Sequence, residues 1–323
     1  MKFQQVNAFK AVIELGTVTA AANYLHIAQP AVSRLIASLE ETVGFALFER
    51  IKGRLQPTAQ GRAFYLEVER AFVGLDRLRR SASSIRQQSS GSLVLAAMPL
   101  LSNLFLPEVL LRSLRGGFSG ALNLQTFRSE EVLQRVAIQT CDIGFALAAE
   151  PGDSMTGLRL NCDCICLLPP GHPLAGLRRP LTLQDLATTP LIRNERDPAQ
   201  QLLDHAFRQE GIHRHDTIEV SFSSAMACLV AGGAGAAVTD PFTAHLARSQ
   251  NEAVTIHRFS PALPFEFYIL LPTLRPLSPA VHRFLCDFFE LARDEGILLR
   301  VEPLSNDVSL FGLPPPWLEV DNP

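Results

Sequence analysis

Apolar side chains in residues 29–43 recur every three or four positions, so they form one stripe along a helix. The stripe consists of Val32, Leu35, Ile36, Leu39 and Val43. A shorter helix is predicted over residues 17–25, and only a few residues separate the two. Two short helices joined by a tight turn form a helix-turn-helix.

The opposite face of residues 29–43 is polar or small, with Gln29, Pro30, Ser33, Arg34, Ala37 and Ser38. Pro30 suits a first helical turn, where its missing N–H would be unpaired anyway. Small residues let a helix enter a major groove about 12 Å wide, where Gln, Ser and Arg bond base edges and phosphates. We expect Thr19, Gln29, Pro30, Ser33 and Arg34 to contact DNA. The alternative is an ordinary surface helix in a bundle.

A two-stranded wing is predicted next. Residues 45–50 alternate as in a strand, and Lys52-Gly53-Arg54 forms a basic turn. Arg50, Lys52 and Arg54 would meet phosphates or the minor groove. Thr58 is placed to cap the following helix.

That helix, about residues 59–88, carries apolar residues at alternating steps of four and three, the pattern of a two-helix seam. The seam consists of Phe64, Val68, Ala71, Leu75, Leu78, Ala82 and Ile85. It predicts pairing with a second copy of the chain. The alternative is packing on the chain's own later domain. Residues 87–91 read as a hinge.

Charge divides the chain in the same place. Residues 1–88 carry a net +5 and the remainder −8, although the whole chain is only −3. A basic head binds phosphates with counterion release, while an acidic body is repelled from the duplex. We find no basic-then-apolar leader and no apolar run near 20 residues, so we expect a cytoplasmic protein without a membrane span.

From Ser92 onward strands and helices alternate, which predicts a parallel α/β layer. Strands are expected at 92–97, 121–127 and 141–148, and helices at 104–115 and 129–140. A second set follows, with strands near 190–193, 217–220 and 235–239 and helices near 198–211, 223–231 and 241–248. Residues 264–272 read as a returning strand, before a helix over 278–295.

Ala28-Gln29-Pro30-Ala31-Val32-Ser33-Arg34 and Leu47-Phe48-Glu49-Arg50 closely resemble the LysR-type transcriptional regulators. Residues 17–25 fit that family's helix pattern in part, whereas residues 55–61 and the extension over 301–323 depart from it. The resemblance implies an N-terminal winged helix-turn-helix, mainly α, over 1–58 and a linker helix with hinge over 59–91. A C-terminal α/β two-lobe, periplasmic-binding-protein-like effector domain follows over 92–300. Its lobe I comprises about 92–162 and 270–300, and lobe II about 163–269. The tail 301–323 stays unexplained.

Residues 67–75 and 95–99 further resemble the branch that senses opines and basic amino acids. The family resemblance implies a regulator that activates a catabolic or transport operon, pairs through the linker helix and forms tetramers. Expected partners are double-stranded DNA with an interrupted inverted repeat, a small effector and RNA polymerase.

The effector is expected beyond the carboxyl ends of strands, where helix N-termini present free N–H groups. Ser102, Asn103 and Ser129 are candidates for an α-carboxylate or amino group, and Asn194 reaches from the other lobe. Asp240 or Glu130 would accept an ammonium or guanidinium. Capping of helices explains the serines and Asn103 equally well. The full candidate set is Met98, Leu100, Ser102, Asn103, Ser129, Glu130, Phe145, Asn194, Phe222 and Asp240.

Cys162, Cys164 and Cys166 alternate and would share one face of a strand. Their spacing does not suit tetrahedral zinc, so we interpret them as packing residues, with metal or redox sensing as the alternative. No phosphate loop, dinucleotide motif or nucleophilic pairing is found, so we expect no cofactor, no metal and no catalysis. The competing classes are an amino-acid-binding protein of the periplasmic type and an enzyme on the same scaffold.

Overall fold

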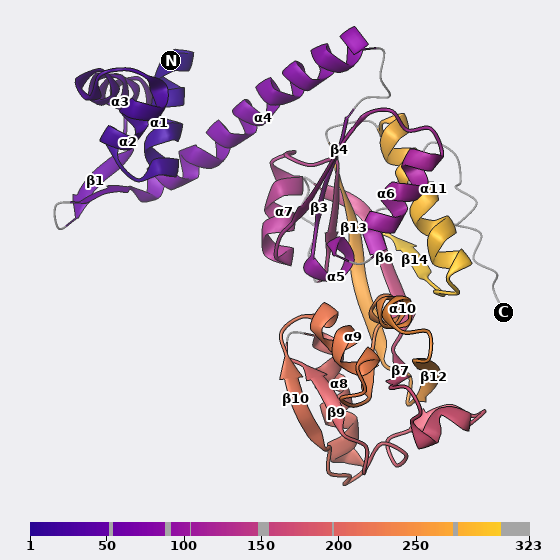
Figure 1. Ribbon diagram of the computed structural model, residues 1–323. Helices are drawn as coiled ribbons and strands as arrows, with labels where there is room; N and C mark the ends of the chain where they lie inside the picture. Colours follow the sequence, from indigo (N-terminus) through magenta and orange to yellow (C-terminus); the bar gives the residue numbers. More distant parts are fainter. Residues whose placement is uncertain are drawn as a thin grey trace. The chain divides into compact units, whose positions relative to one another are not determined.

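The computed structural model describes residues 1–51, 54–87, 92–103, 105–147, 155–195, 197–273 and 277–304 (Figure 1). The chain forms two compact units, one made of Met1–Ser83 with Ile138–Thr140 and a larger one made of Ser84–Ala137 and Cys141–Pro323. Each unit has its own hydrophobic core. No helix in the described part is long and apolar enough to cross a bilayer.

The first unit begins with three helices, α1 (Phe3–Leu15), α2 (Val18–Leu25) and α3 (Gln29–Val43). The predicted helix-turn-helix is confirmed as α2 and α3. Its core contains Phe9, Ala21, Val32 and Leu39, each with no exposed surface. Helix α3 ends at Gly44, whose φ of 82° favours glycine.

The wing consists of β1 (Phe48–Ile51) and β2 (Arg54–Pro57), paired antiparallel with Ile51 opposite Arg54. The predicted wing is confirmed, but its first strand begins at Phe48 rather than residue 45. Phe45 instead packs against Phe64, with ring centroids 6.0 Å apart. The tip residues Lys52 and Gly53 lie outside the described residues.

The linker helix α4 spans Ala59–Gln87. Thr58 caps it as predicted, since its Oγ1 accepts from Gly61 N at 2.9 Å. The start of the predicted seam is used differently from the prediction. Val68 is buried in the core of the head, and the Phe64 ring lies 5.6 Å from that of Phe9. These two residues therefore pack on their own helix-turn-helix, while the expected hinge over 88–91 lies outside the described residues.

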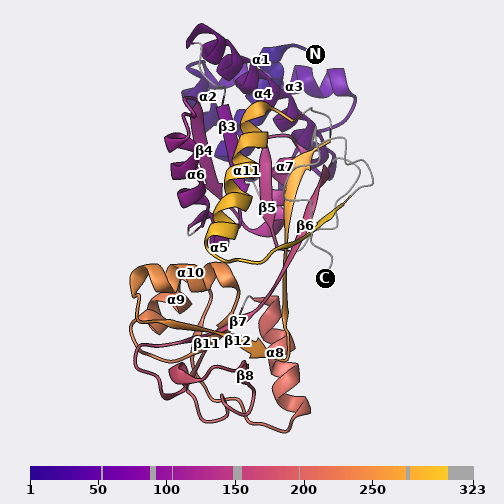
Figure 2. The same ribbon diagram turned by 90° about the vertical axis from the view of Figure 1, so that its right-hand side faces the viewer.

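Lobe I of the second unit is built on a six-stranded sheet in the order β14-β6-β13-β5-β3-β4. The strands are β3 (Ser92–Ala97), β4 (Ala121–Thr126), β5 (Ile143–Ala146), β6 (Met155–Asp163), β13 (Pro264–Pro272) and β14 (Arg300–Pro303). Helices α6 (Phe105–Arg115) and α11 (Pro279–Asp294) pack on one face, and α7 (Ser129–Ala137) covers the other (Figure 2). The short α5 (Pro99–Ser102) follows β3.

The predicted parallel layer is confirmed in β3, β4 and β5, and the returning strand β13 pairs antiparallel with β5. Two expected bounds of this lobe need correction. Strand β13 pairs with β6 along its whole length, so it belongs to lobe I, and lobe II ends near residue 263 rather than 269. The effector domain extends past residue 300, because β14 pairs with β6 up to Pro303; residues 305–323 lie outside the described residues.

Lobe II contains a four-stranded sheet, β11-β7-β12-β8, and a parallel pair, β10-β9. Its strands are β7 (Ile165–Leu168), β8 (Leu181–Thr182), β9 (Leu191–Asn194), β10 (Asp216–Val220), β11 (Ala237–Thr239) and β12 (Thr255–Ser260). Its α-helices, α8 (Pro198–Gln209), α9 (Ser223–Ala231) and α10 (Pro241–Gln250), lie within two residues of their predicted bounds. A 3₁₀ turn covers Pro173–Gly176.

Two chain segments join the lobes, one after β6 and one before β13 (Figures 1 and 2). They are hydrogen-bonded to each other, because Cys164 N donates to Leu263 O at 2.8 Å. Strand β13 runs antiparallel to β5, and Thr239 at the end of β11 lies opposite Ile165 at the start of β7. The carboxyl ends of β5 and β11 therefore face each other across this hinge.

Candidate functional site

The outer face of α3 carries the predicted DNA-contacting side chains. Gln29, Pro30, Ser33 and Arg34 are all exposed, as is Thr19 on α2. Arg34 Nε lies 3.4 Å from Pro30 O, and Gln29 Nε2 lies 3.4 Å from Ser33 Oγ. These long, weak contacts leave the side chains able to bond base edges and phosphates.

Buried contacts fix the direction of this helix. Gln5 Nε2 donates to Ser38 Oγ at 2.9 Å, so Ser38 lies against α1 rather than facing outward as predicted. Glu40 accepts from the backbone N–H groups of Leu47 and Phe48, at 2.7 and 3.2 Å. Glu40 thereby ties α3 to the base of the wing. The sequence analysis missed this role, because the two partners are seven and eight residues away.

The backbones of Arg50 and Arg54 lie in the two wing strands, Arg50 opposite Leu55. The side chains of these two arginines, and all of Lys52, lie outside the described residues. Their contact with DNA stays a prediction.

Beyond the head, α4 keeps apolar side chains on its surface. Leu78 is 67% exposed, and Ala71 is exposed as well. An apolar groove of about 290 Å³ lies between α1 and α4, lined in part by Phe3, Val6, Val68 and Phe72. The side chains of Leu75, Ala82 and Ile85 lie outside the described residues.

The lobe I candidates lie at the carboxyl edge of β3, β4 and β5. Ser102 is buried and accepts from Thr126 Oγ1 at 2.9 Å, and Ser129 Oγ accepts from Leu147 N at 3.0 Å. These bonds tie the end of α5 to β4 and the start of α7 to the segment after β5, so neither hydroxyl caps its own helix. Asn103 and Glu130 are exposed at the same edge.

Three apolar candidates differ in their accessibility. Met98 is 1% exposed, whereas Leu100 is half-buried. Phe145 has no exposed surface, and its ring packs 5.5 Å from that of Phe288, beneath α11. We therefore withdraw the Phe145 side chain from the expected effector contacts, because it belongs to the helix-covered core.

In lobe II, Asn194 ends β9 and is buried. Its Nδ2 donates to Ser223 Oγ at 3.1 Å. This bond joins the end of β9 to the start of α9. Phe222, the residue before α9, is 48% exposed. Both residues lie at the carboxyl edge of the lobe II strands, as predicted from their sequence positions.

Asp240 does not present a free carboxylate. It is 1% exposed and caps α10: its oxygens accept from Thr243 N at 2.9 Å, Thr243 Oγ1 at 2.6 Å and Thr239 Oγ1 at 3.2 Å. Burial raises the pKa of Asp240. These bonds favour a structural role over the predicted recognition of a cation.

A second buried carboxylate, Asp197, escaped the sequence analysis. It is 7% exposed and caps α8 through Oδ1, which accepts from Ala199 N at 2.9 Å, but Oδ2 has no hydrogen-bond partner among the described residues. Burial, followed by the nearby Asp240 carboxylate, raises the pKa of Asp197 to about 7. An Asp-Pro pair opens both α8 and α10, so the sequence signals a cap at each position but not the unpaired oxygen.

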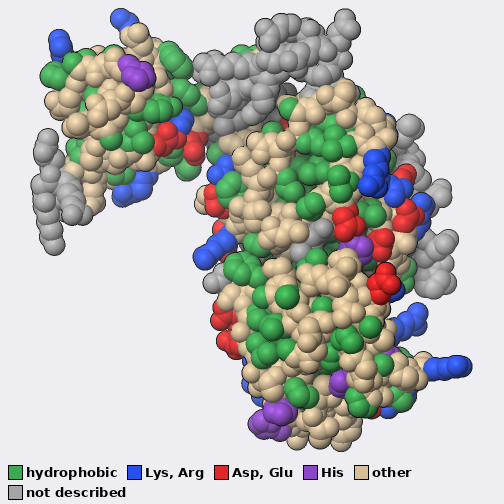
Figure 3. All heavy atoms as spheres, in the orientation of Figure 1, with side chains coloured by type: hydrophobic (Ala, Val, Ile, Leu, Met, Phe, Trp, Pro, Cys, Tyr) green, Lys and Arg blue, Asp and Glu red, His purple; other side chains and the backbone are tan. Residues whose placement is uncertain are grey.

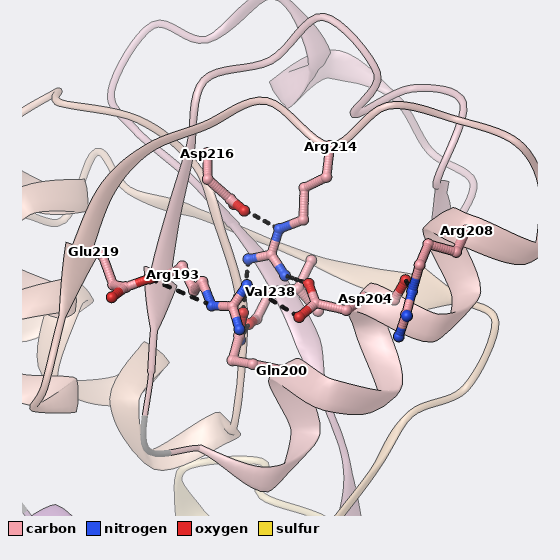
Figure 4. Close-up of polar contacts among 8 residues, drawn as sticks. All are labelled: Arg193, Gln200, Asp204, Arg208, Arg214, Asp216, Glu219 and Val238. Carbon is pink, nitrogen blue, oxygen red and sulfur yellow. Dashed lines mark hydrogen bonds and ion pairs between the residues drawn. The ribbon is translucent and has the colours of Figure 1, made fainter.

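A charged network fixes α8 against β9, β10 and β11 (Figure 4). The guanidinium of Arg214, whose side chain is 8% exposed, binds Asp204 at 2.7 Å, Asp216 at 2.5 Å and Gln200 at 2.7 Å. Arg193 also binds Asp204, at 3.0 Å, and Gln200 Nε2 donates to Val238 O at 2.8 Å. This network positions the start of α8 and therefore Asp197.

The three alternating cysteines are buried, although not on one strand. Strand β6 ends at Asp163 and β7 begins at Ile165, so Cys164 lies at the break between the lobes. Burial raises the pKa of the Cys162, Cys164 and Cys166 thiols. Within the described residues, no three His, Cys, Asp or Glu side chains come together as metal ligands. Neutral, buried thiols fit the packing role.

Comparison with known proteins matches both units to one family. Residues 3–62 match the bacterial regulatory helix-turn-helix protein family, lysR type, and residues 86–289 match the LysR substrate binding domain. The transcriptional activator protein LysR of Escherichia coli is 36% identical over 288 residues, 88% of this chain and 91% of that protein.

Two further comparisons agree. The octopine catabolism/uptake operon regulatory protein OccR of Rhizobium meliloti is 33% identical over 89% of this chain and 95% of its own. The crystal structure of full-length CbnR in complex with its target DNA shares the fold, with a TM-score of 0.64 and 22% identity over 90% of this chain and 99% of CbnR. The relatives are named as regulators, which supports neither the enzyme nor the solute-binding alternative. The chain belongs to the LysR family of DNA-binding transcriptional regulators, with a winged helix-turn-helix head and a two-lobe effector-binding domain.

Proposed function

We propose that the protein binds an interrupted inverted repeat through two winged heads and adjusts transcription when an amino acid or opine-like effector binds between its lobes. The observation that carries the DNA-binding part is the exposed polar face of α3, with Gln29, Ser33 and Arg34 standing on a helix fixed from behind by Val32 and Leu39. Thr19 and Pro30 border this face, and Arg50, Lys52 and Arg54 of the wing supply positive charge beside it.

The spacing of the two heads is proposed to come from α4. The exposed Leu78 and Ala71, and the apolar groove between α1 and α4, are surfaces that a second α4 would cover. Tetramer formation, contact with RNA polymerase and activation of a catabolic or transport operon belong to the same proposal, as does action in the cytoplasm, where the chromosome lies.

An amino acid or opine is proposed as the effector because the polar residues at the facing strand ends suit its groups. Ser102, Ser129 and Asn194 offer hydroxyl and amide groups to a carboxylate or amino group, and OccR, one third identical to this chain, is named for octopine. The proposed effector domain covers residues 92–304.

DNA binding is tested by fluorescence anisotropy with the protein's own upstream promoter and a scrambled duplex of equal length. We expect preference for the promoter and a steep loss of affinity with added salt. Equal affinity for both duplexes would contradict the proposal. A thermal-shift screen of amino acids and opines tests the effector, since a ligand that binds only the folded state raises Tm.

A further inference from the structure

We propose that Asp197 binds the side-chain cation, an ammonium or a guanidinium, of a basic amino-acid effector, at the hinge between the two lobes. This inference rests on the proposed function and specifies its ligand. The sequence analysis assigned a cation to Asp240; the structure points to the other capping aspartate of the same lobe.

The first observation is the unpaired oxygen. Asp197 is more than nine-tenths buried, and only Oδ1 is used, by Ala199 N at the start of α8. In the part of the chain that the structure describes, Oδ2 has no hydrogen-bond partner, and it has almost no contact with solvent. A buried carboxylate oxygen without a donor is unfavourable, so a bound cation there gains a strong, charge-assisted hydrogen bond.

The second observation is the surrounding charge. Asp240 lies close enough to raise the pKa of Asp197, and its own oxygens are already used by Thr239 and Thr243. Within the described residues, no basic side chain forms a hydrogen bond or ion pair with either carboxylate. Arg196 lies outside the described residues. Two neighbouring buried carboxylates favour a cation over a neutral or anionic ligand group.

The third observation is the location. Asp240 follows Thr239, which pairs with Ile165 next to Cys164 at the crossing between the lobes. The nearby carboxylates of Asp197 and Asp240 add to burial in raising the pKa of the Cys164 thiol. Asn194 and Ser223 lie at the same strand edge, which faces Ser102 and Ser129 of lobe I. An amino acid with a basic side chain has a carboxylate for lobe I and a cation for lobe II. Its binding at the hinge would bias the arrangement of the lobes.

Isothermal titration calorimetry on the full chain at pH 8 tests the assignment with matched ligands. L-lysine is compared with L-norleucine, and L-arginine with L-citrulline; each pair differs mainly in the terminal cation. We expect at least one member with a cationic side chain to bind at least tenfold more tightly than its counterpart with a neutral side chain. Equal binding of the members with neutral side chains, or no binding of either member with a cationic side chain, would overturn the assignment of a side-chain cation to this site.

Two variants test Asp197 itself. Asp197→Asn and Asp197→Ser each keep a capping oxygen for α8 but remove the charge, and both should lose at least tenfold in affinity for the cationic ligand. Glu252→Gln removes one exposed charge elsewhere in lobe II and should leave affinity unchanged. Retained affinity in both Asp197 variants would assign the cation to another residue. Anisotropy with promoter DNA on the same samples measures DNA binding. It therefore tests the proposed regulator function independently of effector binding.

Proton linkage gives an independent readout. Because a cation binds the ionised carboxylate, affinity should fall about tenfold from pH 8 to pH 6, and binding near pH 7 should release a proton. Proton release is measured by titration in buffers of different ionisation enthalpy. The Asp197→Asn variant should show neither effect. The same pH dependence in Asp197→Asn, or stabilisation by NaCl or KCl to the same Tm as by the amino acid, would contradict the proposal.

Discussion

His245 of lobe II and Glu108 of lobe I join the two lobes of the effector-binding domain, with 3.0 Å between Nε2 and Oε2. Glu295 approaches the other ring nitrogen, Nδ1, at 3.0 Å. Beneath this polar contact, the Phe242 ring packs edge to face on Phe105, with centroids 5.0 Å apart. The lobes therefore meet through α10 by an aromatic contact under a polar one.

We expect the aromatic contact to contribute more to the free energy of unfolding than the polar contact does. Phe242→Ala should lower the free energy of unfolding of the effector domain by about 3–5 kcal/mol, because it removes a fully buried ring from a packed cluster. Chemical denaturation followed by intrinsic fluorescence and circular dichroism measures this. His245→Gln is the matched control on the same helix and should cost about 1 kcal/mol or less, since the carboxylates are partly exposed. A larger loss for His245→Gln than for Phe242→Ala would contradict this order.

Arg34→Ala should weaken promoter binding about tenfold and lower the slope of log affinity against log salt by about one. The reason is that Arg34 stands on the exposed face of α3, where its Nε lies 3.4 Å from Pro30 O, a weak contact. Anisotropy over a range of salt concentrations measures both quantities.

Arg248→Ala, an exposed arginine at the end of α10, is the control and should leave DNA affinity unchanged. Other arginines of the effector domain lie beside acidic residues over α6 and α11 (Figure 3). Arg112, for example, binds Glu290 at 2.9 Å. An Arg34→Ala variant with wild-type affinity and slope would remove α3 from the DNA contact.

Two glycines of α4 should respond in opposite directions to substitution. A Cβ at Gly61 would lie 2.2 Å from Leu47 O, so Gly61→Ala should destabilise the head by about 1–3 kcal/mol. A Cβ at Gly74 meets nothing within 4 Å, so Gly74→Ala should stabilise α4 by about 0.5–1 kcal/mol. Thermal unfolding followed by circular dichroism distinguishes the two. Equal changes in stability for the two variants would show that the close approach of Gly61 to Leu47 O does not restrict the side chain at position 61.

Asp197 should make the domain less stable as pH rises. Its pKa is about 7 in the folded chain and about 4 when unfolded, so between these values the unfolded chain releases a proton that the folded chain keeps. The free energy of unfolding therefore falls through this window, on the order of 3 kcal/mol. Asp197→Asn should remove that fall, so the variant is more stable than wild type at pH 8 but not at pH 4. Urea denaturation at the two pH values measures this.

Asp185 provides a control of opposite sign. The hydrogen bond from Arg179 holds the pKa of Asp185 well below its usual value, so its contribution to stability is present above about pH 4 and is lost as pH falls below that. Asp185→Asn should lower the free energy of unfolding at pH 7. It should leave unchanged the fall in that free energy between pH 4 and 7 that Asp197 causes. If Asp197→Asn kept the wild-type slope between pH 4 and 7, the buried carboxyl would not be its source.

The DNA-binding head was predictable because its signals are local. The apolar stripe of α3, the small residues at its start and the Thr58 cap all act within a few residues, and the structure confirms them. The seam of α4 was harder. Phe64 and Val68 have the right spacing for a partner helix, but the same residues fit the core of the head, and spacing alone cannot distinguish the two.

The candidate effector site was also predictable only in part. The sequence placed Ser102, Ser129, Asn194 and Asp240 at strand ends, because strands and helix starts leave periodic and capping signals. It could not separate Asp240 from Asp197, since both precede a proline at a helix start. The two residues differ at the second carboxylate oxygen. In Asp240, Oδ2 accepts hydrogen bonds from the hydroxyl groups of Thr239 and Thr243, whereas Asp197 Oδ2 has no partner among the described residues.

The sequence by itself determined the family, most of the helices and strands in their order, and most of the residues that face outward on α3. Tertiary structure decided which strands share a sheet, that β13 and β14 complete lobe I, that Phe145 is core and that Asp197 keeps an unpaired oxygen. The physical reason is range: periodicity and capping depend on neighbours within about one helical turn, whereas pairing, burial and hydrogen-bond satisfaction depend on residues brought together from distant parts of the chain.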